Sequence, residues 1–508
     1  MDENRKIRSA LVSVWDKTGL EPIIRKLHVL GVKLISTGGT QEYIQSLGIE
    51  STAVESLTGY PAVFGGRVKT LHPAVFGGIL FRRDDPEHLS EQKQFHIEPV
   101  DLVIVDLYPF SKTVATTNLE ADIIEKIDIG GISLIRAAAK NYSDVLVVPS
   151  VDDYPVLLDI LEQHQGISTL AQRRGMAARS FAVSSEYDTA IFNYFNRVEQ
   201  LPAIRIASSQ AVSLRYGENP HQKGTFYGDQ SAVFEKLHGK EISYNNLLDL
   251  EAGISLVHDL DQAAFAILKH NNACGVAQRP TAVQAWEAAL AGDPISAFGG
   301  VLVTNVPVDK VTAEQINKLF FEIILAPDYE AGVFELLASK KNRIILRSRP
   351  FELASVQFRS LLNGVLVQDK DLKTETEKDL TTATNRTASS EELSDLLFAN
   401  RLVKHARSNA IVIVKNMQLI GVGAGQTSRV DAVKQAIEKA RNFGFDPRGA
   451  VMASDAYFPF SDSVQLAHEA GITAVIQPGG SVRDGDSIAF ANENGMAMVM
   501  TGVRHFRH

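Results

Sequence analysis

Short apolar runs alternate with helical patterns over the first 150 residues of the chain. The apolar runs, which predict buried strands, lie at residues 9–15, 32–36, 101–110 and 145–150. Between them, apolar residues recur at helical spacing in 20–31, which stops at Gly31, and in 132–141. Because strands that alternate with helices form βαβ units, the pattern predicts an α/β domain with a parallel sheet.

The pattern changes near residue 200. Helical spacing dominates from 151 to 194, but the stretch 196–222 has no clean period, and we interpret it as a connection between two domains. The rest is again mixed α/β, with strands predicted at 343–347 and 410–414. Within it, the polar stretch 370–392 predicts an exposed connection that splits the second half in two. We therefore predict domains at 1–200 and 201–508, the second with two subdomains.

The two pieces of the second half contain similar short strings. ILKHNN (267–272) is similar to LVKHARSN (402–409), and AGDPISAF (291–298) is similar to ASDAYFPF (453–460), with Asp and Phe at equal offsets. Because matches of this length arise easily by chance, duplication and coincidence are equal alternatives at this point.

Composition and charge narrow the class of protein. The 508 residues include 51 Lys plus Arg and 60 Asp plus Glu, a net charge of −9, so any anion site has to be local. The single cysteine, Cys274, excludes an intrachain disulfide and a Cys-rich metal site, which fits a reducing compartment. The sequence has no signal peptide at its start and no apolar run near the ~18 residues of a membrane span. We expect a cytoplasmic protein without nucleic-acid or membrane partners.

Three loops in the first half are candidates for anion binding. STGGT (36–40) and DIGGIS (128–133) each precede a helical segment, where backbone N–H groups and the helix dipole attract anions. Either loop alone is equally well explained as a tight turn. The stretch 56–83 lacks any carboxylate but contains Arg67 and Lys69, which favours an anion site. No P-loop string occurs, and GVGAGQ (421–426) lacks the third glycine of the dinucleotide fingerprint.

Longer motifs resemble a known enzyme family along almost the whole chain. The strings similar to IMP cyclohydrolase are DKTG (16–19), STGGT (36–40), GGRVKTLHPAVFGGIL (65–80), DLYPF (106–110) and DIGGISLIRAAAKN (128–141). Those similar to AICAR transformylase are LRYGENPHQ (214–222), ISYNNLLDLEA (242–252), LKHNNACG (268–275), GDPISAFGG (292–300), GAGQTSR (423–429), SDAYFPF (454–460) and IQPGGSVRD (476–484). They follow one another in the order of the bifunctional purine-biosynthesis enzymes.

The resemblance implies a fold and two reactions. AICAR is formylated from 10-formyltetrahydrofolate as cosubstrate, and the product then closes its ring to IMP with loss of water. The first domain would be a doubly wound parallel sheet like that of methylglyoxal synthase, and the second would contain duplicated cytidine-deaminase-like α/β layers. The family works as a homodimer with transformylase sites across the interface, and it implies no catalytic metal.

The resemblance also assigns cyclohydrolase residues. Lys140 would be the acid–base residue, with Asp128 and Tyr108 beside it and Lys69 stabilising developing charge. The residues implied to bind the nucleotide are Lys17, Thr37, Gly38, Gly39, Thr40, Arg67, Thr70 and Asp106. Without the family, Lys140 would be an ordinary lysine at a helix C-terminus, where the macrodipole favours it.

For the transformylase, the resemblance implies a catalytic set of Lys269, His270 and Asn409. The implied AICAR contacts are Arg215, Tyr216, Gly299, Glu322, Arg429, Tyr457, Phe458 and Arg504, and the implied folate contacts are Asp462, Gln477 and Pro478. Ala273 stands where proline is common in the family, and Tyr457 stands where phenylalanine is usual. A second Lys-His pair, Lys404-His405, is assigned no chemistry.

Three alternatives are weighed against this interpretation. A deaminase-like zinc hydrolase needs an H-x-E string together with a P-C-x-x-C string, and a chain with one cysteine cannot contain the second. Methylglyoxal synthase activity of the first domain would use the same anion loops but gives no role to the other 300 residues. A non-catalytic nucleotide-binding module would not require Lys140, Asp128 and Tyr108.

Overall fold

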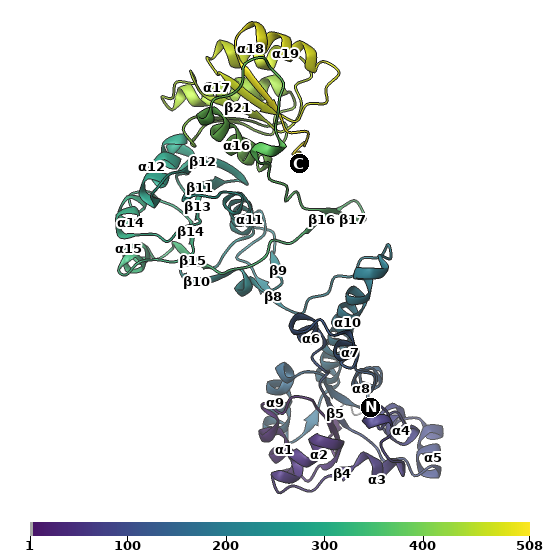
Figure 1. Ribbon diagram of the computed structural model, residues 1–508. Coiled ribbons are helices and arrows are strands. Elements are labelled where there is room, and N and C mark those ends of the chain that lie inside the picture. Colours follow the sequence, from purple (N-terminus) through teal and green to yellow (C-terminus); the bar gives the residue numbers. More distant parts are fainter. Residues whose placement is uncertain (1–3) are drawn as a thin grey trace. The chain divides into compact units, whose positions relative to one another are not determined.

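The computed structural model describes residues 4–508, and the chain divides into two compact units, residues 1–209 and 210–508 (Figure 1). The division falls inside the stretch 196–222 that lacks a clean period. Each unit has its own sheets and its own buried hydrophobic clusters. No helix in the described range has both the length and the apolar character needed to cross a bilayer.

The first unit is built on a five-stranded sheet whose strands are all parallel. Its strands are β2 (Ser9–Ser13), β3 (Lys33–Ser36), β4 (Thr52–Ala53), β5 (Leu102–Val105) and β6 (Leu146–Val148). The order β4-β3-β2-β5-β6 confirms the predicted doubly wound sheet, and the four predicted apolar runs contain β2, β3, β5 and β6. Because strand order reverses between β2 and β5, a crevice is expected beyond the carboxyl ends of these two strands.

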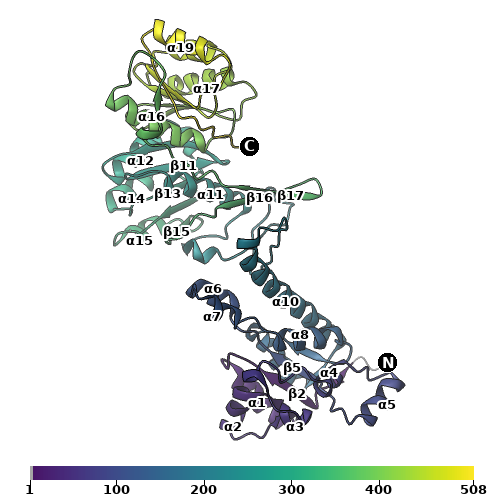
Figure 2. The same cartoon turned by 45° about the vertical axis from the view of Figure 1, so that its right-hand side comes forward.

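Helices cover both faces of this sheet. They are α1 (Leu20–Val29), α2 (Gly38–Ser46), α3 (Val54–Thr58), α4 (Pro73–Leu80), α5 (Pro86–Gln94), α6 (Phe110–Thr116), α7 (Glu120–Ile124), α8 (Gly130–Lys140), α9 (Tyr154–Gln163) and α10 (Leu170–Glu199). Helices α1 and α9 pack together on one side, and α4, α8 and α10 lie on the other (Figures 1 and 2). A short antiparallel pair, β1 (Arg5–Lys6) and β7 (Ile167–Ser168), completes the unit.

The second unit contains two six-stranded mixed sheets with the same topology. The first has the order β10 (Phe234–His238), β15 (Ile344–Ser348), β14 (Ile323–Ala326), β13 (Val301–Thr304), β11 (Ala264–Lys269) and β12 (Asn272–Gln278). The second has the order β18 (Thr381–Thr382), β23 (Ala497–Met500), β22 (Ala474–Gln477), β21 (Val451–Ser454), β19 (Ile411–Val414) and β20 (Leu419–Gly423). Parallel and antiparallel pairings also agree strand by strand, which confirms the duplication.

The register of the duplication differs from the one that the short strings suggest. Helices α11 (Tyr244–His258) and α16 (Ser390–Lys404) correspond at an offset of 146 (390 − 244 and 404 − 258), and each follows a serine capping box. Lys269 ends a strand, whereas Lys404 ends a helix, so the two Lys-His strings are not counterparts. The segment 291–298 precedes β13, whereas 453–460 begins within β21, so the second proposed match is also wrong.

Five layers form the second unit. Helices α12 (Ala282–Gly292), α13 (Pro294–Ala297), α14 (Lys310–Ile316) and α15 (Val333–Ala338) belong to the first repeat, and α17 (Arg429–Asn442), α18 (Asp462–Glu469) and α19 (Asp484–Glu493) belong to the second. Along β11, Phe265 and Ile267 pack with Trp286 of α12, whereas Leu268 packs in a cluster shared with α11 and α16. This shared cluster joins the two sheets through α11 and α16 (Figure 2).

Two further segments complete the second unit. A short pair, β8 (Ala211–Ser213) and β9 (Thr225–Tyr227), precedes the first sheet, and a hairpin of β16 (Val356–Leu361) and β17 (Gly364–Asp369) follows it. The prediction that the stretch 370–392 is exposed is wrong at Glu375, which is 2 % exposed. Its carboxylate accepts a hydrogen bond from Asn400 at 2.8 Å and lies 3.1 Å from the His505 ring, because the C-terminal segment packs against it.

The close approach of α17 to β20 predicts which glycine is essential for stability. A Cβ added at Gly421 would overlap the carbonyl oxygen of Ala436, so Gly421→Ala should force the helix away from the sheet. Overpacking of this kind typically costs about 1–3 kcal/mol of unfolding free energy. Gly364→Ala is the control, because nothing lies within 4 Å of its Cβ position. Urea unfolding of both variants checks this, and equal midpoints would contradict the close packing.

Candidate active site

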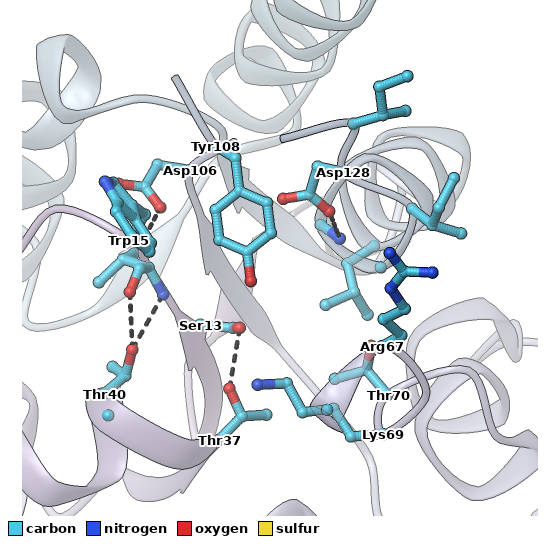
Figure 3. A pocket seen from close by; sticks show the side chains of 18 of the residues that line it. Ser13, Trp15, Thr37, Thr40, Arg67, Lys69, Thr70, Asp106, Tyr108 and Asp128 are labelled. Carbon is cyan, nitrogen blue, oxygen red and sulfur yellow. Dashed lines mark hydrogen bonds between the residues drawn. The ribbon is translucent and has the colours of Figure 1, made fainter. Parts of the chain in front are cut away.

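A cavity of about 560 Å³ lies in the first unit, at the carboxyl ends of β2 and β5 where strand order reverses (Figure 3). The sequence-predicted residues that line it are Lys17, Thr37, Gly39, Thr40, Arg67, Lys69, Thr70, Asp106, Tyr108 and Asp128. They come from loops far apart in sequence, which the parallel strands bring to one edge of the sheet. The amine of Lys69 and the hydroxyl of Tyr108 point into the same part of the cavity, beside Ser13 and Thr37 (Figure 3).

The N-terminus of α2 forms one wall of the cavity. Thr37 is its N-cap, and Gly38 has a φ of 40°, a left-handed value that glycine adopts without strain. The Thr40 hydroxyl is already used, because it donates to the Val14 carbonyl at 2.9 Å. The Thr40 amide donates to the Thr37 carbonyl at 3.1 Å, so within the described helix the amides of Gly38 and Gly39 are left to face a ligand. A Cβ at Gly38 would lie 3.6 Å from the Lys69 amine. A lysine above a helix N-terminus is a site for an anion.

The N-terminus of α8 forms the opposite wall. The Gly131 amide donates to the Asp128 carboxylate at 2.6 Å, and a Cβ at Gly131 would lie only 2.8 Å from that carboxylate. A larger residue there would therefore displace the Asp128 carboxylate from this position. Tyr187 of α10 fixes the loop, since its hydroxyl accepts from the Asp128 amide at 2.8 Å and donates to the Lys126 carbonyl at 2.5 Å.

Burial changes the acidity of the cavity's polar groups. Desolvation raises the pKa of Asp128, against hydrogen bonds from the backbone of Gly131 and the positive charge of Lys69. Desolvation also raises the pKa of Asp106, whose carboxylate accepts from the amides of Trp15 and Asp16 and so closes the loop after β2. The pKa of Tyr108 is raised by burial and by the nearby Asp128 charge. A carboxylate of raised pKa is suited to accept a proton near neutral pH.

An aromatic wall that we did not predict completes the cavity. The rings of Trp15 and Tyr108 meet edge to face at 5.2 Å, and the Lys126 amine lies 4.5 Å from the centre of the Trp15 ring. Trp15 lines the cavity and is 51 % exposed. Its position at the carboxyl end of the first predicted strand, 9–15, is the signal that could have identified it, because parallel strands end at a common edge.

Two predicted residues have other surroundings than expected. Arg67 forms an ion pair with Glu125, which also lines the cavity, so its guanidinium is already neutralised in this state. Lys140 is the exposed last residue of α8, nine positions after Gly131, or about 14 Å along the helix at ~1.5 Å per residue. The structure therefore does not bring Lys140 into the cavity, which Lys17 and Lys69 line, and the amine of Lys69 points into it (Figure 3).

In the second unit, one group of predicted residues surrounds the end of β11. Lys269 donates to the Phe298 carbonyl at 2.8 Å, and the exposed His270 follows it in the turn to β12. Gly299 has a φ of 73° and donates to the Phe320 carbonyl at 2.8 Å. Glu322 is paired with Lys240.

A second group surrounds the N-terminus of α17. The Asn409 side chain accepts a hydrogen bond from Arg429 at 2.8 Å, and the buried Arg429 also forms an ion pair with Asp455. Tyr457, two positions after Asp455, is 42 % exposed. The Arg504 guanidinium lies 4.4 Å from the centre of the Phe506 ring.

The remaining predicted contacts differ in how accessible they are. Arg215 is exposed, and it donates to the Tyr216 hydroxyl at 2.6 Å. Asp462 is exposed at the start of α18. The predictions for Phe458, Gln477 and Pro478 are corrected by burial: Phe458 and Gln477 are 0 % exposed, and Pro478 is also buried. Phe458 belongs to the core beneath the sheet, so its ring cannot stack on a ligand.

The second Lys-His pair is structural. Lys404 and His405 both contact the Asp259 carboxylate, at 3.0 and 2.7 Å, and so tie the end of α16 to the end of α11. Within residues 4–508, no cluster of three or more His, Cys, Asp or Glu side chains is arranged to hold a metal ion.

Comparison with known proteins identifies the class of protein. The family model described as an MGS-like domain matches residues 19–133, and the family model described as the AICARFT/IMPCHase bienzyme matches residues 138–439. The fold and these matches define a bifunctional enzyme, an AICAR transformylase and IMP cyclohydrolase. A protein from Bacteroides thetaiotaomicron named bifunctional purine biosynthesis protein PurH is 60 % identical over all of both chains. One of the same name from Chloroflexus aurantiacus is 48 % identical over 100 % of this chain and 99 % of that one.

The chain belongs to the family of the bifunctional purine biosynthesis protein PurH. It catalyses the last two steps of IMP biosynthesis, so the alternative of a non-catalytic nucleotide-binding module is wrong. A solved structure titled "Crystal structure of ForH" is 34 % identical, with a TM-score of 0.34 over 37 % of this chain and 99 % of that chain.

The raised pKa of Asp128 predicts a pH-dependent stability difference. A carboxyl whose pKa is higher in the folded state than its unfolded value of about 4 stabilises the fold while it is protonated. This contribution is lost as the pH rises from about 4 through the folded-state pKa. Asp128→Asn does not titrate and keeps an oxygen that accepts from Gly131. The stability of the variant, measured as its unfolding free energy minus that of the parent, should therefore be greater at pH 7 than at pH 4.

The measurement is denaturant unfolding at both pH values, followed by Trp15 fluorescence in a Trp286→Phe background. A difference that moves the opposite way between pH 4 and pH 7 would place the Asp128 pKa below its ordinary value.

Proposed function

We propose that the two reactions are divided between the two units, with ring closure in the cavity of residues 1–209 and formyl transfer in residues 210–508. The observation that supports this most is the cavity itself, where two helix N-termini, Lys69, Tyr108 and Asp128 converge. The second unit, by contrast, has the half-buried Lys269 and the exposed His270 at a strand end.

In the first unit, the phosphate of the formylated intermediate binds at the N-terminus of α2. The amides of Gly38 and Gly39 face it, and Lys69 neutralises its charge from the opposite side. Thr37, Thr70 and Lys17 also line the cavity. The ring system then extends toward the wall of Trp15 and Tyr108, whose faces suit a flat heterocycle.

Ring closure requires the carboxamide nitrogen to attack the formyl carbon. The new C–N bond forms as the formyl oxygen takes up a proton, and the nitrogen gives up its proton to a base. Asp128, with its raised pKa, is the proposed acceptor of that proton, and Tyr108 or Lys69 stabilises the oxygen. Loss of water from the carbinolamine then yields the C=N bond of IMP. Lys140 acts on this step, if at all, from outside the cavity.

In the second unit, 10-formyltetrahydrofolate is the proposed cosubstrate. His270 accepts the proton of the AICAR amine as that amine attacks the formyl carbon, and the tetrahydrofolate nitrogen leaves with a proton. Lys269 and Asn409 assist the transfer. Asp462 is the accessible member of the predicted folate contacts. The proposed AICAR contacts are Arg215, Tyr216, Gly299, Glu322, Arg429, Tyr457 and Arg504.

We further propose that a second copy of the chain completes this site. Among the described residues, no hydrogen bond or ion pair connects the Lys269 group with the Asn409 group. The hairpin of β16 and β17 also exposes apolar side chains, with Leu362 fully exposed and Phe358 51 % exposed. Exposed apolar surface of this kind is typical of an interface between copies.

The division of labour predicts that single substitutions separate the two half-reactions. Asp128→Asn should lower ring closure by about 10²-fold or more and leave formyl transfer intact, so that the formylated intermediate accumulates. His270→Ala should do the reverse, and should still convert supplied formylated intermediate to IMP. Each half-reaction is assayed on each variant, with circular dichroism to check folding.

A folded His270→Ala protein that loses both reactions equally would refute the division. Lys140→Ala is measured alongside, and we expect a smaller loss of ring closure than with Asp128→Asn, because its amine lies outside the cavity. An equal loss would return the acid–base role to Lys140.

A shared transformylase site predicts complementation between inactive chains. His270→Ala and Arg215→Ala proteins, each inactive in formyl transfer, should recover part of that activity when mixed and allowed to exchange subunits. Mixed dimers of the two variants contain one site with all native residues if each site draws on both copies. Subunit exchange, confirmed by mass spectrometry, without any recovered activity would place each site within one chain.

A further inference from the structure

The turn that presents His270 is built from residues that do not favour its conformation. Lys269 pairs with Asn272 across the hairpin, so His270 and Asn271 form a two-residue loop, and both have positive φ values, 54° and 62°. A two-residue loop with this backbone strongly prefers Asn-Gly or Gly-Gly. Asn and His adopt the left-handed region more often than most residues with a Cβ, but less readily than glycine. An interaction from outside the loop therefore helps to hold this turn.

Asp249 of α11 supplies that interaction. Its carboxylate accepts a hydrogen bond from the Asn271 amide at 2.6 Å, and the backbone of His270 also contacts it. Asp249 is partly buried, and desolvation raises its pKa while these backbone contacts oppose the shift. The imidazole of His270, on the turn itself, is an ionisable group that acts on this carboxylate.

The second repeat contains the same device where no catalytic residue is proposed. Asn416 and Met417 form the corresponding turn, with φ values of 54° and 55°. Their amides donate to Asp395 of α16 at 2.8 and 2.6 Å. Asp395 stands 146 positions after Asp249, the offset of the duplication (395 − 249). A carboxylate that fastens a left-handed turn is thus a common feature of both repeats.

The two turns differ in what else holds them. The carbonyl of Met417 accepts from the Gln278 amide at 3.0 Å, and Arg279 donates to the Asn416 carbonyl at 2.6 Å, so the second turn is docked on the first repeat. No bond of this kind reaches the backbone of His270 and Asn271 from the second repeat in the described chain. The first turn therefore depends more strongly on its carboxylate.

We propose that Asp249 is a positioning residue for formyl transfer: it holds the strained His270–Asn271 turn so that the imidazole stays aligned with the AICAR amine. This inference rests on the proposed role of His270. Asp249 acts through the turn backbone and does not need to touch either substrate.

The test compares Asp249→Ala with its counterpart Asp395→Ala. Both remove a carboxylate that accepts from a turn, so both should lower the melting temperature. Only Asp249→Ala should lower the kcat of formyl transfer, by about 10–100-fold, with little change in KM, because a misplacement near 1 Å can cost ~10²-fold. Asp249→Asn, which keeps an acceptor oxygen, should retain most of the kcat.

A suppressor makes the test independent of folding losses. Adding Asn271→Gly to Asp249→Ala should restore part of the kcat, because glycine adopts the left-handed conformation without a supporting carboxylate. Equal kcat values for Asp249→Ala and Asp395→Ala would overturn the inference, and so would a loss that Asn271→Gly does not relieve. If His270→Ala itself keeps full formyl transfer, the proposed function fails instead, which separates the two outcomes.

Discussion

The direction of parallel strands is the constraint on which both halves of the molecule depend. When strands run the same way, their carboxyl ends and the N-termini of the following helices meet at one edge of the sheet. In the first unit this brings together the loops that follow strands ending at Ser13, Ser36 and Val105, and it points α2 and α8 at the same cavity. The polar residues there need little further organisation, because backbone amides already provide positive potential.

The second unit follows the same rule along β13, β14 and β15, and departs from it at its antiparallel strands. Its strands β11 and β19 run antiparallel to their neighbours, so each is followed by a hairpin turn and not by a helix. In both repeats an aspartate from the preceding helix fastens that turn. The turn of the second repeat is docked on the first repeat, whereas the turn of the first repeat exposes a histidine. In our proposal, the same local arrangement thus supports packing in one repeat and chemistry in the other.

Much of this could be predicted from the sequence, for identifiable reasons. Continuous apolar runs identify buried parallel strands such as β5, and the Gly loops mark the helix N-termini that form the cavity. Burial could not be predicted from motif strings: Phe458 lies in a motif next to an exposed tyrosine, yet it points into the core. Lys140 was misplaced because a motif does not show that a helix moves its last residue away from its first. The register of the duplication was missed because it depends on Asp249 and Asp395, which lie outside the matched strings.

The central claim is that the nucleotide occupies the cavity of the first unit, and intrinsic fluorescence tests it most directly. The chain has two tryptophans: Trp15 lines the cavity, and Trp286 is 1 % exposed in a core of the second unit. Titration with IMP should give a saturable change in emission that disappears in Trp15→Phe and shifts to higher IMP concentration in Lys69→Ala. A change of equal size in Trp15→Phe, or no change at IMP concentrations where equilibrium dialysis detects binding, would contradict the account.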